Sequence, residues 1–423
     1  MLRKAAAALG IVAMVSPLVS AEISFDSPNK TSLNQEIAAQ AVNVPAPVKA
    51  DANSVAASRS AKDWTIMVFV NGKNNLAPYA VKDMNEMEQV GSTSRINVVT
   101  ETGLVSGYGD VPFTGTRRFL IKKDNDTNTV TSPVLQDMGS VDMGNYTSVV
   151  DFVNWAKQNY PAKHYLLIIW NHGSGWDKSM PQGVTKGISY DDETGNHINT
   201  PQMGQILKQV GGVDVYGSDA CLMQMAEVDY EIKDYVTYIV GSEETEPGDG
   251  YTYNTFLGPL AANPSMTPEQ VGELAVNAYA DHYQQEGNQG STQSLVKSAA
   301  IPQFTVLMNN FASAMMQAGD KDTVKNAINN SQSYAVADNH DIWHFASLMS
   351  QTTKSPAVKS AAQALMDYIS NTLVLVNRPV GSGYTNSHGI DAYMPTYGFE
   401  SAYNDLQWAK ASQWEEFIKW YEN

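Results

Sequence analysis

Cysteine is almost absent from this sequence: Cys221 is the only one among 423 residues. A single cysteine cannot pair within the chain, which excludes a fold held together by internal disulfides. The 43% of hydrophobic residues provide ample material for a core instead. A lone thiol is either a small buried apolar group or a reactive one, and the count alone does not separate the two.

Basic residues are also scarce. The chain has 27 Lys and Arg against 44 Asp and Glu, which gives a formal net charge of −17. This excess of negative charge disfavours nucleic acids and anionic membranes as partners and favours cationic ones. Beyond the N-terminal region no apolar segment is long enough to cross a bilayer. We therefore predict no membrane span and no nucleic-acid partner.

The N-terminal region has the pattern of a secretory signal peptide. Arg3 and Lys4 precede an apolar run at residues 5–18, and small residues follow at 19–21. The run is shorter than the ~20 residues that a transmembrane helix needs. We predict a cleaved signal peptide at residues 1–21, a flexible lead-in or pro-segment at 22–62, and a secreted or periplasmic protein.

From residue 63 onward, apolar runs typical of buried strands alternate with amphipathic helical segments. This alternation predicts an α/β fold with a mostly parallel sheet. Residues 116–121 are expected to form part of an antiparallel excursion, and the chain from about residue 267 is expected to be largely helical. The expected strands are 64–70, 96–100, 165–170, 213–217, 238–241, 294–301 and 389–394. The expected helices are 78–90, 147–158, 203–210, one opening at 222, and 303–318, 357–377 and 411–421.

Two residues with chemical potential follow two of these strands. His172 comes directly after the strand 165–170, and Cys221 lies between the strand 213–217 and the helix expected from Leu222. Ligands of parallel sheets bind at the carboxyl ends of the strands. A histidine can serve there as a general base, and a helix N-terminus would lower the pKa of the thiol. The pair is the nucleophile and base of a cysteine hydrolase.

Several segments resemble the clostripain family of cysteine peptidases, whose members share a caspase-like fold. The motifs Asn171-His172-Gly173 and Asp219-Ala220-Cys221, each after a strand, carry the resemblance together. It implies a caspase-like catalytic domain at residues 63–300, with a mostly parallel sheet sandwiched by helices, and a mainly helical C-terminal subdomain at 301–423. The similar segments are 64–88, 165–176, 186–207, 218–251 and, more weakly, 387–395.

The resemblance also implies a role for individual residues. His172 would be the catalytic histidine and Cys221 the nucleophile, with the backbone N–H groups of Gly173 and Cys221 as the oxyanion hole. Asp219 matches the acidic residue at the base of the S1 pocket, which implies protein or peptide substrates cleaved after Arg or Lys. The alternative for Asp219 is an N-cap of the helix expected after Cys221.

Family members are commonly cleaved between the histidine and cysteine strands into two chains that stay together. Lys178 and Lys186 lie in that interval, and Lys186 is the preferred candidate for self-cleavage. We expect a monomer or this self-processed two-chain form.

No cofactor is predicted to be required, although some relatives depend on Ca²⁺. Clusters of acidic loop residues are able to bind Ca²⁺ and are also common as solvated surface charges. The remaining histidines are scattered, so no zinc spacing is evident. The acidic residues in question are Asp191, Asp192 and Glu193 in one loop and Glu243, Glu244, Glu246 and Asp249 in another.

Two other functions are compatible with the same residues. The chain could be a non-enzymatic surface or binding protein that retains the peptidase fold, or a cysteine hydrolase or transpeptidase that acts on non-protein amides. The presence of His172, Gly173, Asp219 and Cys221 together favours a cysteine endopeptidase. Alkylation of Cys221 would separate an enzyme from a binding protein. Cleavage of Arg-containing peptides would separate the endopeptidase from a hydrolase of non-protein amides.

Overall fold

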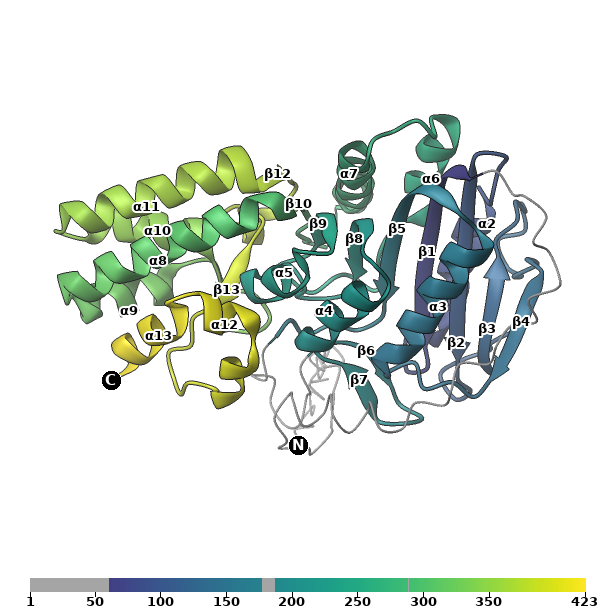
Figure 1. Cartoon of the computed structure of the whole chain (residues 1–423), viewed down its shortest axis with the longest axis horizontal. Coiled ribbons are helices and arrows are strands. Elements are labelled where there is room, and N and C mark those ends of the chain that lie inside the picture. Colours follow the sequence, from purple (N-terminus) through teal and green to yellow (C-terminus); the bar gives the residue numbers. More distant parts are fainter. Residues whose placement is uncertain (1–60, 177–186, 288) are drawn as a thin grey trace, which may run out of the picture.

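The computed structural model describes residues 61–176, 187–287 and 289–423. Within these ranges, nine strands form one sheet in the order β12-β10-β9-β8-β5-β1-β2-β3-β4 (Figure 1). The five central strands are parallel, and antiparallel strands extend the sheet at both edges. The predicted α/β class, the mostly parallel sheet and the antiparallel excursion are thereby confirmed.

The strands run close to the predicted ranges. Near-continuous apolar runs form the central ones because both of their faces are covered. The parallel strands are β1 (Lys62–Gly72), β2 (Ile96–Leu104), β5 (Ala162–Trp170), β8 (Val213–Asp219) and β9 (Val236–Gly241). The antiparallel strands are β3 (Gly115–Leu120), β4 (Val134–Gly139), β10 (Ser294–Lys297) and β12 (Val374–Asn377). A short hairpin, β6 (Ile188–Asp191) and β7 (Asn196–Ile198), lies beside the sheet.

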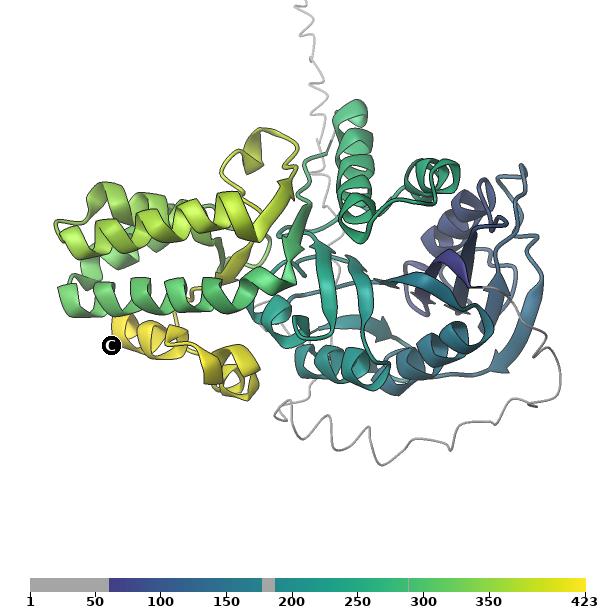
Figure 2. The same cartoon turned by 45° about the horizontal axis from the view of Figure 1, so that its top comes forward.

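Two rows of helices cover the sheet, one on each face (Figure 2). Successive side chains of β1 pack into two hydrophobic cores, one on each face of the sheet. Met67 and Phe69 belong to one cluster, and Ile66 and Val68 belong to the other. The first cluster lies under α3 (Tyr146–Asn159), α4 (Thr200–Gln209) and α5 (Ala226–Ile232). The second lies under α2 (Ala77–Glu88), α6 (Tyr253–Ala262) and α7 (Pro268–Glu286).

The C-terminal third is mainly helical and lies at the β12 end of the sheet (Figure 1). A two-stranded sheet of β11 (Asn339–Asp341) and β13 (Asp391–Tyr393) lies among its helices. The helices are α8 (Ile301–Ala318), α9 (Lys321–Asn330), α10 (Ile342–Thr352), α11 (Pro356–Tyr368), α12 (Gln407–Ala411) and α13 (Trp414–Glu422). No helix within the described ranges is long and apolar enough to cross a membrane.

The predicted helix at 357–377 was wrong over its last part. α11 ends at Tyr368, a π-helical turn follows at Ile369–Leu373, and the chain then enters β12. The apolar residues of β12 are drawn into a strand because β10 offers them an unpaired sheet edge. Residues 298–300, predicted to continue a strand, form a 3₁₀ turn that leads into α8. The domain boundary at residue 300 stays a prediction, and β12 beyond it belongs to the main sheet.

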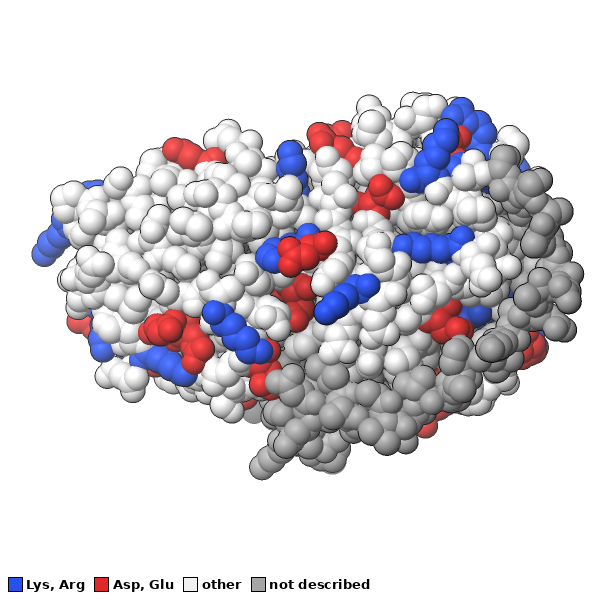
Figure 3. Space-filling model, viewed as in Figure 1, with Lys and Arg blue, Asp and Glu red and all other residues white. Residues whose placement is uncertain are grey.

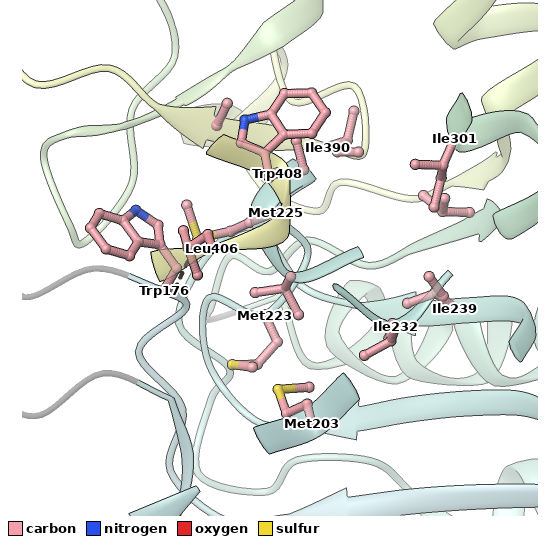
Figure 4. Close-up of a cluster of buried hydrophobic side chains, with 14 of the residues drawn as sticks. Trp176, Met203, Met223, Met225, Ile232, Ile239, Ile301, Ile390, Leu406 and Trp408 are labelled. Atoms are coloured by element: carbon pink, nitrogen blue, oxygen red, sulfur yellow. Dashed lines mark hydrogen bonds between the residues drawn. The ribbon is translucent and has the colours of Figure 1, made fainter. Parts of the chain in front are cut away.

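A buried cluster joins the loops at the strand ends to the C-terminal third. Met223 and Met225, in the loop after Cys221, lie near Trp176, Leu406 and Trp408 (Figure 4). The ring of Trp176 meets those of Tyr393 and Tyr403 edge to face, at centroid distances of 5.0 and 4.8 Å. The C-terminal third therefore supports the loops that carry the candidate site.

Candidate active site

The two candidate catalytic residues emerge side by side from neighbouring strands. Trp170 of β5 is paired with Asp219 of β8, and each candidate lies two residues further along its chain. The N–H of Asn171 donates to the carbonyl oxygen of Asp219 at 3.2 Å, which keeps the two chains together past the strand ends. The two strands are neighbours in the sheet.

Gly173 brings the two loops into backbone contact. A Cβ atom added at this position would lie 2.4 Å from the carbonyl oxygen of Cys221, closer than real Cβ contacts. Any other residue would therefore push the histidine loop away from the cysteine loop. This close approach explains why a glycine follows His172.

The imidazole of His172 is buried and oriented by an amide. Its Nε2 atom lies 2.6 Å from Oδ1 of Asn75, in the turn between β1 and α2. An amide oxygen only accepts, so Nε2 donates and the lone pair of the neutral ring lies on Nδ1. Burial lowers the pKa of His172 to about 4, so the ring is an uncharged base at neutral pH.

Asn75 is a site residue that the sequence analysis missed. It lies in the polar turn after the first central strand, a location where ligands of parallel sheets bind. That location is the signal that could have singled it out. The sequence offers Asn71 at the end of β1 and Asn74 and Asn75 in the turn, without indicating which of them reaches the histidine. Only the packed loops select Asn75.

Cys221 does not lie at a helix N-terminus, and that prediction was wrong. α5 begins at Ala226, with Met225 as its N-cap. The intervening loop is held by the chain after β9: the N–H groups of Leu222 and Gln224 donate to the carbonyls of Glu244 and Ser242 at 3.1 and 3.0 Å. These bonds compete with helix formation.

Leu222 has a left-handed backbone, with φ of 63°. This conformation is costly for a branched side chain. The strain falls directly after Cys221, where it turns the chain sharply away from the strand and so helps to fix the position of the thiol.

The surroundings of Cys221 favour the protonated form of its thiol. Burial is the main reason that its pKa rises to about 12, and the carboxylates of Glu246 and Glu244 raise it further. The N–H of Glu246 donates to Sγ at 3.3 Å, which partly offsets this effect. The expectation of a lowered thiol pKa was therefore wrong, because acidic side chains surround the thiol in place of a helix N-terminus.

Asp219 is a buried carboxylate at the end of β8. Its Oδ1 accepts from the N–H of Tyr251 at 3.1 Å, and its Oδ2 accepts from the hydroxyl of Tyr253 at 2.8 Å. Burial raises its pKa to about 6 in spite of these bonds. The alternative reading of Asp219 as a helix N-cap was wrong, since α5 is capped by Met225.

A second buried carboxylate lies beside Asp219. Burial and the neighbouring Asp219 raise the pKa of Glu246 well above its usual range, and Gln293 Nε2 donates to its Oε1 at 3.2 Å. The sequence analysis noted Glu246 only as a member of an acidic loop. Two carboxyl groups held together in a buried place share protons readily, and their site would accept a cation.

The other predicted acidic residues have separate partners. Lys73 contacts Glu193 at 2.6 Å and Asp191 at 3.9 Å, while Glu243 accepts from the N–H of Gly389 at 3.0 Å and Glu244 from that of Ala335 at 3.0 Å. These contacts hold loops together, and Ca²⁺ binding stays a prediction. Lys178, Lys186 and the predicted signal and lead-in segments up to residue 60 lie outside the described residues.

Basic side chains do not gather into one dominant region on the face in Figure 3. On the face in Figure 3, basic and acidic side chains are scattered among uncharged ones. A surface for nucleic-acid phosphates would need clustered Lys and Arg.

A cysteine and a histidine at adjacent strand ends, on a caspase-like fold, form a site of the cysteine-hydrolase class. The chain belongs to the clostripain family, whose C11 peptidase model matches residues 68–421. It is 26% identical over 222 residues to clostripain from Hathewaya histolytica, a match that covers 47% of this chain and 42% of clostripain. The match thus spans less than half the length of that relative.

Solved structures share the fold. A secreted C11 cysteine protease from Bacteroides thetaiotaomicron, in complex with an irreversible peptide inhibitor, is 19% identical with a TM-score of 0.65. An inactive zymogen C11 protease from Parabacteroides distasonis is 18% identical with a TM-score of 0.61. Each similarity covers 84% of this chain and 99% of the other. The caspase-like fold is confirmed.

Proposed function

We propose that this protein is a secreted cysteine endopeptidase that cleaves peptide bonds after Arg or Lys. The observation that carries the proposal is the backbone contact between the loops of His172 and Cys221, with the buried carboxylate of Asp219 two residues before the cysteine. Family membership supports it, as does the peptide inhibitor bound to the similar protease from B. thetaiotaomicron.

In the proposed reaction, the substrate carbonyl is attacked by the sulfur of Cys221 while His172 takes the thiol proton. A resting ion pair is disfavoured, since burial keeps the thiol protonated and the imidazole neutral. The proton therefore moves during the attack, and Asn75 holds the ring in the orientation that receives it.

The tetrahedral oxyanion is stabilised by the backbone N–H groups of Gly173 and Cys221. As the C–N bond breaks, His172 gives the proton to the leaving amine, and an acyl-enzyme forms on sulfur. Water then attacks the thioester with His172 as its base, which releases the acid and restores the thiol. No metal is needed for these steps.

Asp219 supplies the specificity for Arg or Lys at the residue before the cut. A buried carboxylate next to a second one, Glu246, gains most from a cationic side chain, because that side chain neutralises charge that water cannot reach. Self-cleavage at Lys186 or Lys178 would follow from the same preference. We propose that the active form is a monomer or this two-chain product.

The test is hydrolysis of fluorogenic peptides that end in Arg, Lys, Leu or Asp, with wild type and Cys221→Ala. Cleavage after Arg and Lys that is lost in Cys221→Ala is expected. Asp219→Asn should lower kcat/KM for Arg peptides by about 100-fold or more, the loss of a charge-assisted pair of about 3 kcal/mol. Asp214→Asn is the matched control on the same strand, because Asp214 lies at its other end beside His164.

Each departure from this pattern has a distinct meaning. Cleavage after Leu or Asp that requires Cys221 would keep the nucleophile and remove Asp219 from the specificity role. Absence of cleavage, with and without Ca²⁺ and after nicking between His172 and Cys221, would favour a binding protein.

A further inference from the structure

Three potential metal ligands converge beside the C-terminal part of α7. They are Asp249, from the loop between β9 and α6, and His282 and Glu286, one turn apart on α7. One ligand atom of each lies within 4.8 Å of the other two. The sequence analysis missed this group because Asp249 is far from the helix in sequence.

We propose that these three side chains form a site for a divalent transition metal such as Zn²⁺. Nε2 of His282 and Oε1 of Glu286 are 3.6 Å apart. Two ligands of one tetrahedral zinc, at bond lengths of about 2.0–2.2 Å, are separated by about 3.4 Å. The spacing is thus too long for a hydrogen bond and close to that of two ligands of one ion.

The state of His282 supports the proposal independently. Its Nε2 atom is shielded from solvent and has no hydrogen-bond partner among the described residues. A buried, unpartnered ring nitrogen calls for an explanation, and a metal would satisfy it. The side chain of His282 as a whole is 24% exposed and that of Glu286 is 35% exposed, so the group lies close to the surface.

The ligand types define the class of metal. One imidazole and two carboxylates suit Zn²⁺ and its first-row neighbours, whereas Ca²⁺ and Mg²⁺ prefer oxygen ligands alone. The site shares Asp249 with one of the acidic loops considered for Ca²⁺, but its imidazole ligand favours a transition metal. Water would complete the coordination.

Lys82 competes with the metal for Asp249. Its Nζ lies 2.7 Å from Oδ1 of Asp249, and both side chains are partly exposed. A metal would use the other carboxylate oxygen or displace the ammonium group. Removing the charge of Lys82 should therefore strengthen metal binding. If Asp249 were not a metal ligand, this substitution would have no such effect.

A bound metal would fasten the loop that holds Asp219. Asp249 is followed by Gly250, whose carbonyl accepts from the hydroxyl of Tyr283 at 2.9 Å, and by Tyr251, whose N–H donates to Asp219 at 3.1 Å. The metal would add a second attachment of this loop to α7. Hydrogen exchange at residues 250–252 should then slow when the site is filled.

The test titrates ZnCl₂ into the Cys221→Ala chain by calorimetry, since a free thiol would itself bind zinc. We expect one Zn²⁺ per chain, affinity at least about tenfold lower after His282→Ala, and tighter binding after Lys82→Gln. His164→Ala is the matched control, because His164 also neighbours one carboxylate, at 3.0 Å, and should leave affinity unchanged. Circular dichroism checks that each variant is folded.

Three results would overturn the site: no Zn²⁺ bound at millimolar metal, affinity unaffected by His282→Ala, or equal binding of Ca²⁺. All are measured in an inactive chain. The outcome is therefore independent of whether the protein is a peptidase.

Discussion

The surroundings of Cys221 and His172 favour the uncharged form of both side chains. The thiol has a pKa of about 12 and the imidazole one of about 4, so at neutral pH the proton belongs to sulfur. Many reactive cysteines are thiolates at neutral pH, because a nearby positive charge lowers the pKa of the thiol. Here the neighbours are Glu244 and Glu246, which have the opposite effect.

We predict slow alkylation of Cys221 by iodoacetamide in the uncleaved chain at pH 7. Only the thiolate reacts, and a pKa of about 12 leaves little of it, compared with a free cysteine whose pKa is ~8.5. The alkylation rate should still rise above pH 9. Poor access of the reagent to the thiol would slow alkylation without this dependence on pH. An alkylation rate above that of glutathione at pH 7 would contradict the protonated thiol.

A second prediction concerns the pH dependence of cleavage. Asp219 has a pKa of about 6, so its charge is present above that pH and is lost below it. For Arg peptides, kcat/KM should fall as the pH drops through 6, by up to about tenfold per unit. His172 remains an uncharged base over this range because its pKa is about 4.

The control for that pH profile is the same measurement on Asp219→Asn between pH 4.5 and 8. The variant should have low activity on Arg peptides and no inflection near pH 6. An inflection that survives the substitution would assign the titration to another group, with Glu246 the nearest.

At the scale of the elements, the contact between the β5 and β8 loops is the most sensitive to substitution. Gly173→Ala would place a Cβ 2.4 Å from a backbone oxygen, which cannot move as a flexible side chain would. We expect kcat/KM to fall by about 100-fold, the cost of a displacement of about 1 Å between reacting groups.

Gly258→Ala is the control for that substitution. Gly258 lies in α6, and an added Cβ there meets nothing within 4 Å. It should preserve activity, because Gly258 lies in α6, outside the two loops that carry His172 and Cys221. Full activity of Gly173→Ala would show that the two loops need not touch.

The elements that the sequence predicted well are those whose pattern is set by burial. The apolar run at residues 64–70 reads as a two-sided buried strand because it lies in the centre of the sheet. Residues 222–225 and 374–377 were misread as helical because distant segments compete for their backbone or offer a free edge. The same limit applies to the site: motifs indicated His172 and Cys221, but only packing selects Asn75 and Glu246 as their neighbours.

At the scale of the whole molecule, the C-terminal third is part of the scaffold of the site. β12 completes the sheet edge beside β10, and Trp408, Tyr393 and Tyr403 belong to the same buried cluster as Met225. We predict that a chain ending at residue 300 fails to form a cooperative fold, because this apolar surface would be exposed.

Thermal unfolding followed by circular dichroism, with residues 301–423 supplied as a separate chain, tests that prediction. The truncated chain alone should show no sharp transition, and adding the second chain should restore one. A sharp transition and full peptide cleavage from the truncated chain alone would establish the predicted boundary at 300 as that of an independent domain.

The position of β12 in the sheet also sets an order of events during synthesis. The strands and loops that bear His172 and Cys221 leave the ribosome well before residues 374–377, which close the edge of the sheet. At a synthesis rate of ~5–20 residues per second, β12 is made roughly ten seconds or more after Cys221. A nascent chain therefore carries His172 and Cys221 before the sheet beside them is complete.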